Sequence, residues 1–324
     1  MLPAATIRTA IEERLFGEEG GREPISWKTA AGGLSDASVW RVERGQEAYA
    51  VRRWWKGIDP RHVAWVSATL NEVVTAGLSY VAAPVVDDDA WPLIDAVSDR
   101  WEAAPWKPGT PLDAAPPTWS AVAASVEGLV EFHRRVRNRG RCPVASRSAF
   151  VERAARLRAL PTGQLRLPQS TTTVFPELAR IAEKLSPAAR DASQALEPWV
   201  NAALPLQPIH GDARPEHFLL DKDSLTGLID FGAMRVDTPL ADLARFAGEL
   251  AAGDGAYRDT IVAAYSVASG TTVDPRAVAA LDLSGAVISG ANWLRWLAVP
   301  GGVSREPARV RERLRSILAR LGGV

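Results

Sequence analysis

The stretch from His210 to Met234 reads HGDARPEHFLLDKDSLTGLIDFGAM. It sets Asp212 and Asp230 in loop-like segments on either side of two short apolar runs, HFLL and TGLID. Two such runs joined by turn residues predict a β-hairpin. A hairpin here brings both carboxylates to the same end of its strands, facing one space.

A third polar group, His217, follows Asp212 by five residues. Two carboxylates and a nitrogen ligand around one opening suit a hard divalent cation that also takes phosphate oxygens, as magnesium does. Transfer of a phosphoryl group mainly requires positioning and charge neutralisation, with one carboxylate to orient the attacking hydroxyl. The stretch therefore predicts a metal–nucleotide site for phosphate transfer.

Three motifs in this region read HGDARPEH, IDFG and DTPLADLAR. With them the chain resembles the aminoglycoside phosphotransferase and choline kinase-like family, a branch of the protein-kinase-like fold. The resemblance runs from about residue 25 to about residue 300 and is sharpest between about 210 and 245. The spacing of the first two motifs is the strong signal, since HGD alone is common.

The resemblance implies that Asp212 is the catalytic carboxylate and that Asp230 bridges a metal to the phosphates. It implies that His210 braces the loop and that Asp242 bonds loop or helix backbone without touching substrate. The alternative for Asp212 and Asp230 is an ordinary capping or turn aspartate.

Two positions leave alternatives open. His217 stands where the family has a metal-binding asparagine. Because imidazole prefers softer ions than magnesium, His217 either favours manganese, hydrogen-bonds the loop, or marks the loss of a second metal. Arg214 either meets oxygens of the transferring phosphate or is a surface arginine.

The N-terminal part holds a glycine pair, Gly32 and Gly33, in TAAGGLSDASVWRVE, followed by Ser35. The pattern is not that of a Walker motif. It matches the glycine-containing hairpin tip of kinase-like folds, where bare backbone approaches phosphates, although a plain turn also fits. Downstream, AYAVRRWW places Ala50 and Arg52 on one face of a strand, with Arg52 as the phosphate-binding cation where the kinase-like pattern has lysine.

The resemblance assigns three further nucleotide contacts. Glu72, on a helix from about residue 61 to 76, is the candidate partner of Arg52, and an ordinary surface glutamate is the alternative. Glu102 and Ala104, in WEAAPW at the end of the last strand of the small lobe, are expected to bond the adenine edge through free backbone groups.

The sequence says less about the residues that bind the phosphate acceptor. Trp293 and Trp296 lie three apart on a predicted helix and so share a face. They either stack on a sugar or cationic amine, or pack in the core. Family breadth admits aminoglycosides, other amino sugars, choline-like alcohols and homoserine-like metabolites as acceptors.

The fold class expected is α+β, bilobal and protein-kinase-like. An N-lobe over residues 1–105 contains an N-terminal helix at about 4–16, five or six strands including 79–86, and the helix that begins at Pro60. A C-lobe over residues 106–324 is mainly helical. Its helices are expected at about 117–137, 147–160, 173–185, 186–203, 238–252, 254–269, 274–298 and 304–321.

Composition agrees with a cytoplasmic enzyme. Basic and acidic residues number 38 each, so no polyanion-binding surface for nucleic acid is expected. The single cysteine, Cys142, excludes an internal disulfide, and no window predicts a signal peptide or membrane span. We expect ATP and Mg²⁺, with Mn²⁺ as the alternative metal, a small-molecule hydroxyl acceptor, and a monomer or weak dimer.

Two other functions remain open from sequence. Arg52 and His217 are replacements that a degenerate nucleotide-binding module without transfer activity would also show. A helical scaffold protein is the third reading, and it leaves the spacing of Asp212 and Asp230 as coincidence.

Overall fold

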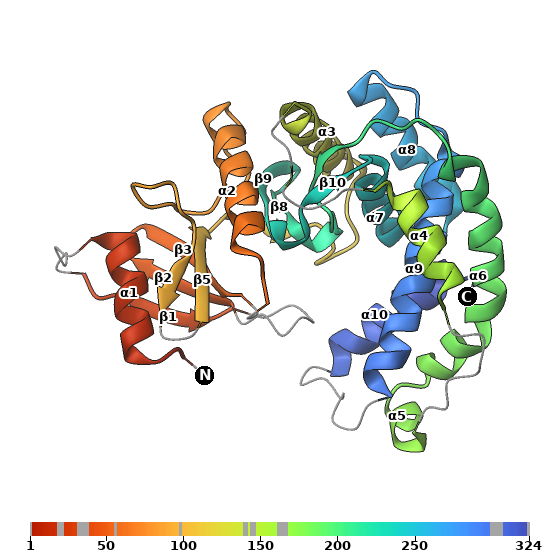
Figure 1. Ribbon diagram of the computed structural model, residues 1–324, viewed down its shortest axis with the longest axis horizontal. Helices are drawn as coiled ribbons and strands as arrows, with labels where there is room; N and C mark the ends of the chain where they lie inside the picture. Colours follow the sequence, from red (N-terminus) through yellow and green to blue (C-terminus); the bar gives the residue numbers. More distant parts are fainter. Residues whose placement is uncertain are drawn as a thin grey trace.

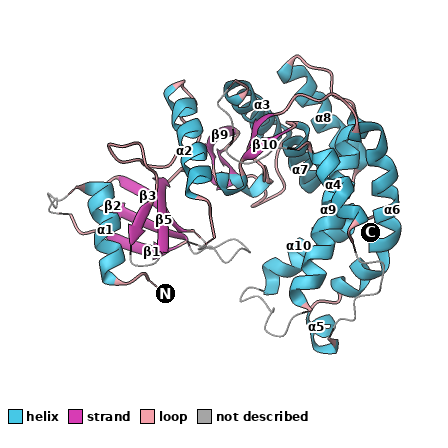
Figure 2. Cartoon of the chain, in the orientation of Figure 1, coloured by secondary structure: helices cyan, strands magenta, loops and turns pink. Residues whose placement is uncertain are grey.

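The computed structural model describes residues 2–17, 23–30, 39–54, 57–96, 99–138, 142, 147–160, 168–298 and 307–322. Strands gather in the N-terminal half and helices fill the C-terminal half, as Figures 1 and 2 show. The expected α+β, kinase-like class is confirmed. The lobe boundary at residue 105 stays a prediction.

The N-terminal third of the chain, up to Pro105, forms one antiparallel sheet with α1 (Ala5–Phe16) against it. Its strands lie in the order β1-β2-β3-β5-β4. Inward residues such as Trp40, Val42 and Trp101 meet Ile11 of α1 in a small core, which is why these alternating sequences form strands. The strands are β1 (Ser26–Thr29), β2 (Val39–Arg44), β3 (Glu47–Arg53), β4 (Ile94–Ala96) and β5 (Asp99–Pro105).

Helix α2 (Pro60–Thr75) lies between the sheet and the helical half (Figure 1). Asp59 caps it by accepting from the Arg61 N–H, and Pro60 suits the first turn. Its buried residues Leu70 and Val73 belong to the large core of the helical half. The apolar stripe of α2 thus ties the sheet to the rest of the chain.

The segment 79–86, expected as a strand, is not one. It makes a single parallel bridge, Val81 to Leu228, and the Ala82 N–H bonds the Leu228 carbonyl at 3.0 Å. Its apolar residues Val81 and Ala83 are buried against the helical core rather than in the sheet. Short apolar runs fit either environment, so the pattern could not separate them.

The rest of the chain is mainly helical, with its core between α6 (Glu177–Val200), α7 (Leu240–Ala251) and α9 (Pro275–Leu297). Two helices expected at 173–185 and 186–203 are one helix, α6, which continues through Pro187 because Ile181, Ala188, Ala192 and Leu196 keep one buried face. Helix α5 (Gln169–Val174) was not expected. The other helices of this part are α3 (Trp119–Val136), α4 (Ala149–Arg158), α8 (Gly255–Ser269) and α10 (Pro307–Arg320).

Short strands flank the two loops that contain Asp212 and Asp230. The expected hairpin is β8 (Phe218–Asp221) with β9 (Ser224–Leu228), and Phe218 pairs with Leu228 at its base. Strand β6 (Thr110–Pro111) adds to β8, and β7 (Gln207–Ile209) pairs with β10 (Arg235–Asp237). The loops before β8 and after β9 therefore leave from the same end of the hairpin.

Helix α9 is the one helix of the described ranges that is long and apolar enough to cross a membrane by length and composition. Its apolar window is 61% buried inside the protein, as in the central helix of a soluble core.

Candidate active site

The catalytic loop, His210 to His217, runs from β7 to a 3₁₀ turn (Pro215–His217) that leads into β8. Gly211 has φ +85°, and a Cβ there would lie 1.9 Å from the Ala233 carbonyl oxygen. No side chain fits in that space, because real contacts of this kind exceed about 3 Å. The Gly of the HGD motif therefore lets the catalytic loop lie against the loop that follows β9.

Asp242, on α7, holds this loop through its backbone. Its two oxygens accept from the N–H groups of His210 at 2.7 Å and Gly211 at 2.8 Å. The predicted backbone-bonding role of Asp242 is confirmed. Burial would raise the pKa of Asp242, but its hydrogen bond with His133 helps bring it below the ordinary value. His133, on α3, bonds Tyr265 at 2.8 Å through its other ring nitrogen.

Two stacked histidines connect the catalytic loop to the end of β9, with ring centroids 5.6 Å apart. The His210 ring bonds the Ile229 carbonyl through Nε2 at 2.8 Å, and its Nδ1 accepts from the Asp212 N–H at 3.3 Å. The Nδ1 of His217 bonds the Asp212 carbonyl at 2.8 Å. Because a carbonyl only accepts, Nδ1 of His217 carries the proton and, in the neutral ring, Nε2 keeps its lone pair.

Asp230 follows β9 in the left-handed conformation, φ 60° and ψ 62°, which aspartate tolerates better than most residues. One oxygen of its half-exposed side chain lies 3.7 Å from Nε2 of His217. His217 therefore touches the loop of Asp212 with one nitrogen and faces Asp230 with the other. The hairpin thus brings the loops of Asp212 and Asp230 together at His217.

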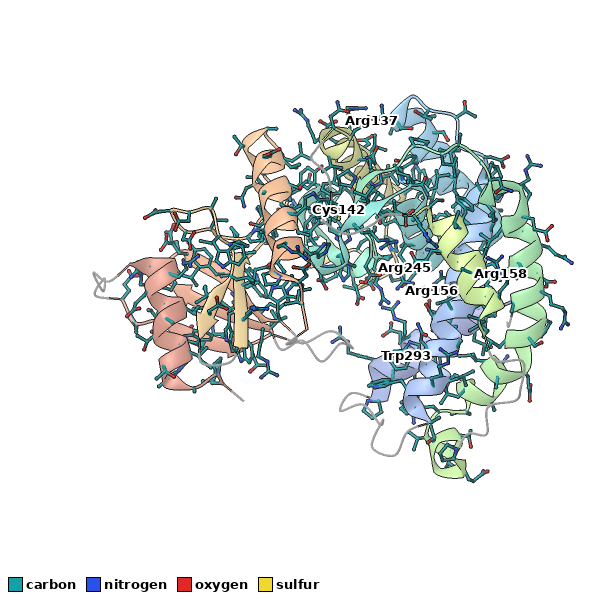
Figure 3. All side chains as sticks on the ribbon, in the orientation of Figure 1. Arg137, Cys142, Arg156, Arg158, Arg245 and Trp293 are labelled. Atoms are coloured by element: carbon teal, nitrogen blue, oxygen red, sulfur yellow. The ribbon has the colours of Figure 1, made fainter. Side chains whose placement is uncertain are left out.

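The Asp212 side chain is fixed by two arginines. Its Oδ1 accepts from Nε of Arg214 at 3.1 Å and from Nε of Arg245, on α7, at 3.0 Å. The Arg245 side chain is labelled in Figure 3. Burial would raise the pKa of Asp212, but the two guanidinium charges outweigh it and hold the pKa well below the ordinary range. The carboxylate is thus ionised and oriented, with both arginine contacts on one oxygen.

Arg52, on β3, joins the sheet to this loop. Its Nη1 lies 2.9 Å from Asp230 and its Nη2 lies 2.8 Å from Glu102, its neighbour on β5. The guanidinium stacks over Trp54 at 4.0 Å from the ring centroid. A Cβ at Gly232 would lie 2.8 Å from Nη1, so the missing side chain admits Arg52. Burial would lower the pKa of Arg52, but the carboxylates raise it above the ordinary value.

The partners assigned to the nucleotide need revision on one point. Hydrogen-bonded residue pairs alternate with non-bonded pairs along β3 and β5. The Trp54 N–H bonds the Arg100 carbonyl, and the Trp106 N–H bonds the Ala48 carbonyl. By the same alternation the backbone groups of Glu102 and Ala104 face β3 and are not free for an adenine edge, which corrects that expectation. The pairing of Glu72 with Arg52 stays a prediction.

Other expected site residues stand as follows. Gly32, Gly33 and Ser35 lie outside the described residues. Trp293 is half-buried against the core, while Trp296 is 40% exposed. Their rings meet edge to face at 5.0 Å, so they do share a helix face.

Sequence reasoning missed Arg245 and Glu249. Asp242, Arg245 and Glu249 stand at i, i+3 and i+7 on α7, a spacing that places all three on one face of the helix. This spacing is the signal from which both residues could have been predicted. The side-chain role of Glu102 had no such signal, because it depends on the register between β3 and β5.

A divalent ion would find a partial set of ligands here. Asp230 offers a half-exposed carboxylate and His217 a nitrogen lone pair aimed at it. The described residues contain no group of three or more metal-binding side chains. This donor set fits a metal that takes its other ligands from phosphate and water, as magnesium does.

Comparison with known proteins settles the family. The model of the phosphotransferase enzyme family matches residues 26–281, most of the chain. The chain belongs to this family. The predicted family relationship and the expectation of a phosphotransferase enzyme are confirmed. No curated protein matches the chain by sequence.

Three solved structures of phosphotransferases and kinases share the fold of this chain. An aminoglycoside phosphotransferase from Alicyclobacillus acidocaldarius is 19% identical, with a TM-score of 0.61 over 91% of each chain. A spectinomycin phosphotransferase in complex with ADP and spectinomycin is 10% identical, with a TM-score of 0.69 over 98% of each chain. An amicoumacin kinase in complex with AMP-PNP and Ca²⁺ is 10% identical, with a TM-score of 0.62 over 90% of this chain and 87% of the other.

Proposed function

We propose that this member of the phosphotransferase enzyme family transfers the γ-phosphate of ATP to a hydroxyl of a small molecule. The observation that carries the proposal is the shared neighbourhood of Asp212 and Asp230, joined through His217, with Arg52 bound to Asp230. A fixed carboxylate, a second carboxylate and a cation around one space are what phosphoryl transfer requires.

In this proposal Asp212 orients the acceptor hydroxyl. Arg214 and Arg245 both bind its Oδ1, so Oδ2 is the atom that faces the acceptor. The acceptor oxygen bonds the γ-phosphorus as the bond to the ADP oxygen breaks, and the hydroxyl proton passes to Oδ2 and then to solvent. The low pKa of Asp212 makes it a weak base, which suits a loose transition state that needs orientation more than proton abstraction.

Asp230 and His217 would hold the divalent metal, and Arg52 would bind the phosphates. The metal supplies charge neutralisation on the phosphate oxygens when it is bound. Arg52 and Asp230 now bind each other at 2.9 Å, and nucleotide binding would exchange that pair for phosphate and metal contacts. At the sheet edge, alternation leaves the Ala103 N–H and the Pro105 carbonyl directed away from β3, where they would meet the adenine. We propose a cytoplasmic location.

The test is ATP turnover with Mg²⁺ or Mn²⁺ over a panel of cationic, neutral and anionic hydroxyl compounds. Phosphomonoester formation is followed by phosphorus NMR, and Asp212→Asn is the control. We expect one acceptor class to be phosphorylated by the wild type and not by the variant. Phosphorylation that is unaffected by Asp212→Asn would refute the assigned role.

A nucleotide-binding module without transfer is the second candidate. The Arg52–Asp230 ion pair favours it, because it occupies both the cation and the metal carboxylate within the protein. An ATP-dependent rise in melting temperature with no turnover on any acceptor would favour this module over the enzyme.

A further inference from the structure

Asp212 belongs to a closed ring of six alternating charges. Glu216 accepts from Nη1 of Arg214 and from Nη2 of Arg313, each at 3.0 Å. Glu249 lies 3.3 Å from Nη1 of Arg245 and accepts from Nη1 of Arg313. The order around the ring is Asp212, Arg214, Glu216, Arg313, Glu249, Arg245 and back to Asp212.

The residue that closes the ring comes from the last helix. Arg313 lies on α10, whereas the family match ends at residue 281. Val310, Leu314 and Ile317 bury α10 in the large core, so the helix fixes the start of the Arg313 side chain. Figure 1 shows α10 alongside α9. The family pattern therefore gives this position no role.

We propose that Arg313 is a positioning residue for Asp212, acting through Glu216 and Glu249 from outside the part of the chain that defines the family. It keeps those two glutamates from drawing Arg214 and Arg245 away from Asp212. The proposal rests on the proposed phosphotransferase function, because the positioning matters for an acceptor hydroxyl at Asp212.

Burial strengthens the competition of Glu216 and Glu249 with Asp212 for the two guanidinium groups of Arg214 and Arg245. The side chains of Arg313 and Glu249 are 13% and 9% exposed, and Glu216 is 30% exposed. Charges screened so little by water interact strongly and leave a costly imbalance when one partner is lost. Without Arg313, Glu216 keeps Arg214, while Glu249 keeps Arg245 and Arg320, which lies 3.3 Å away.

Other charges around Glu216 act in the same direction. Asp113 and Glu249 both repel its carboxylate. A glutamate with two acidic neighbours has the more need of guanidinium partners. Loss of Arg313 would therefore tighten the hold of Glu216 on Arg214 and loosen the hold of Arg214 on Asp212.

The first test uses Arg313→Gln and the control Arg311→Gln, an exposed arginine of the same helix that bonds the Val174 carbonyl. Hydrogen exchange followed by mass spectrometry reports the catalytic loop without requiring turnover. We expect exchange in peptides covering 210–217 to rise about tenfold in Arg313→Gln and to stay unchanged in Arg311→Gln. Equal exchange in the two variants would overturn the proposal.

Kinetics provide the second test. Arg313→Gln should lower kcat about tenfold while KM for ATP stays within about twofold, and Arg313→Lys should recover most of kcat because it keeps the charge. The double variant Arg313→Gln/Glu216→Gln should be more active than Arg313→Gln alone, since it removes a competitor for Arg214. A double variant that is worse than either single variant would indicate a merely structural role and sink the proposal.

The outcomes separate this inference from the proposed function. An active wild type whose kcat and loop exchange are indifferent to Arg313→Gln refutes the inference and leaves the proposed function standing. A wild type without any turnover refutes the proposed function, and the exchange comparison then decides whether Arg313 orders the loop. If Arg313→Gln does not fold, Arg313→Met is judged against Arg311→Met by the same exchange measurement, and a rise over 210–217 is expected in Arg313→Met alone.

Discussion

Replacing Glu102 by Gln tests which glutamate supports the nucleotide-binding cation. Glu102 is 8% exposed and Arg52 is 17% exposed, so water screens their 2.8 Å pair weakly. Removing one partner of a buried pair costs about 3–5 kcal/mol. Arg52 keeps the half-exposed Asp230 and the Trp54 ring, which reduces the expected loss in the free energy of unfolding to about 2 kcal/mol.

The assay is thermal and urea unfolding of Glu102→Gln, Arg52→Gln and the double variant, with Glu72→Gln as the competing candidate partner of Arg52. A loss of about 2 kcal/mol lowers the melting temperature by about 3 °C in a chain of 324 residues. The Glu102–Arg52 cycle should show a coupling of about 1–2 kcal/mol, and the Glu72–Arg52 cycle much less. The reasoning fails if Glu102→Gln unfolds like the wild type while Glu72 couples to Arg52.

Four further results are expected. Gly211→Ala should lower the unfolding free energy by about 3 kcal/mol, from a clash with the Ala233 carbonyl and a positive φ, and urea midpoints near those of the wild type would contradict this. Asp242→Asn should cut kcat at least about tenfold, with nucleotide affinity nearly unchanged in calorimetry, because the lost acceptor frees a loop N–H. The pKa values of Asp212 and Asp242 are lower in the folded state, so both carboxylates add stability that is complete above their unfolded pKa of about 4 and is lost as the pH falls further. Urea midpoints measured from pH 7 to pH 2 check this. A wild-type profile as flat below about pH 4 as that of Asp212→Asn would contradict it. His217→Asn should lower the ratio of turnover with Mn²⁺ to turnover with Mg²⁺ several-fold, because an amide oxygen suits the harder ion, and an unchanged ratio would exclude His217 from the metal.

Much of the fold is readable from sequence because its signals are local. Asp59 and Pro60 mark the start of α2, and the paired apolar runs after His217 mark the hairpin. The break expected between 185 and 186 does not occur, because the buried face of α6 outweighs the hydrogen bond that Pro187 removes. The segment around Val81 misled because its partners come from a distant part of the chain.

In the candidate site, too, some residues could be predicted from the sequence and others could not. Asp212, Asp230 and Asp242 are readable because one motif fixes their spacing along the chain. The partners of Arg52 are not, since Glu102 reaches it across a strand pair and Asp230 across 178 positions of sequence. The role of Arg313 is the hardest to predict, because the sequence of an arginine-rich helix does not show which arginine faces water and which pairs with a buried glutamate.

The central claim is that Asp212 and Asp230 serve one metal–nucleotide site with different tasks. Electron paramagnetic resonance of Mn²⁺ in the presence of ATP measures this directly in the wild type, Asp230→Asn and Asp212→Asn. We expect ATP-dependent Mn²⁺ binding to be lost in Asp230→Asn and kept in Asp212→Asn, with turnover lost in both. Equal Mn²⁺ binding by Asp230→Asn and the wild type, or no ATP-dependent binding by the wild type, would contradict the account.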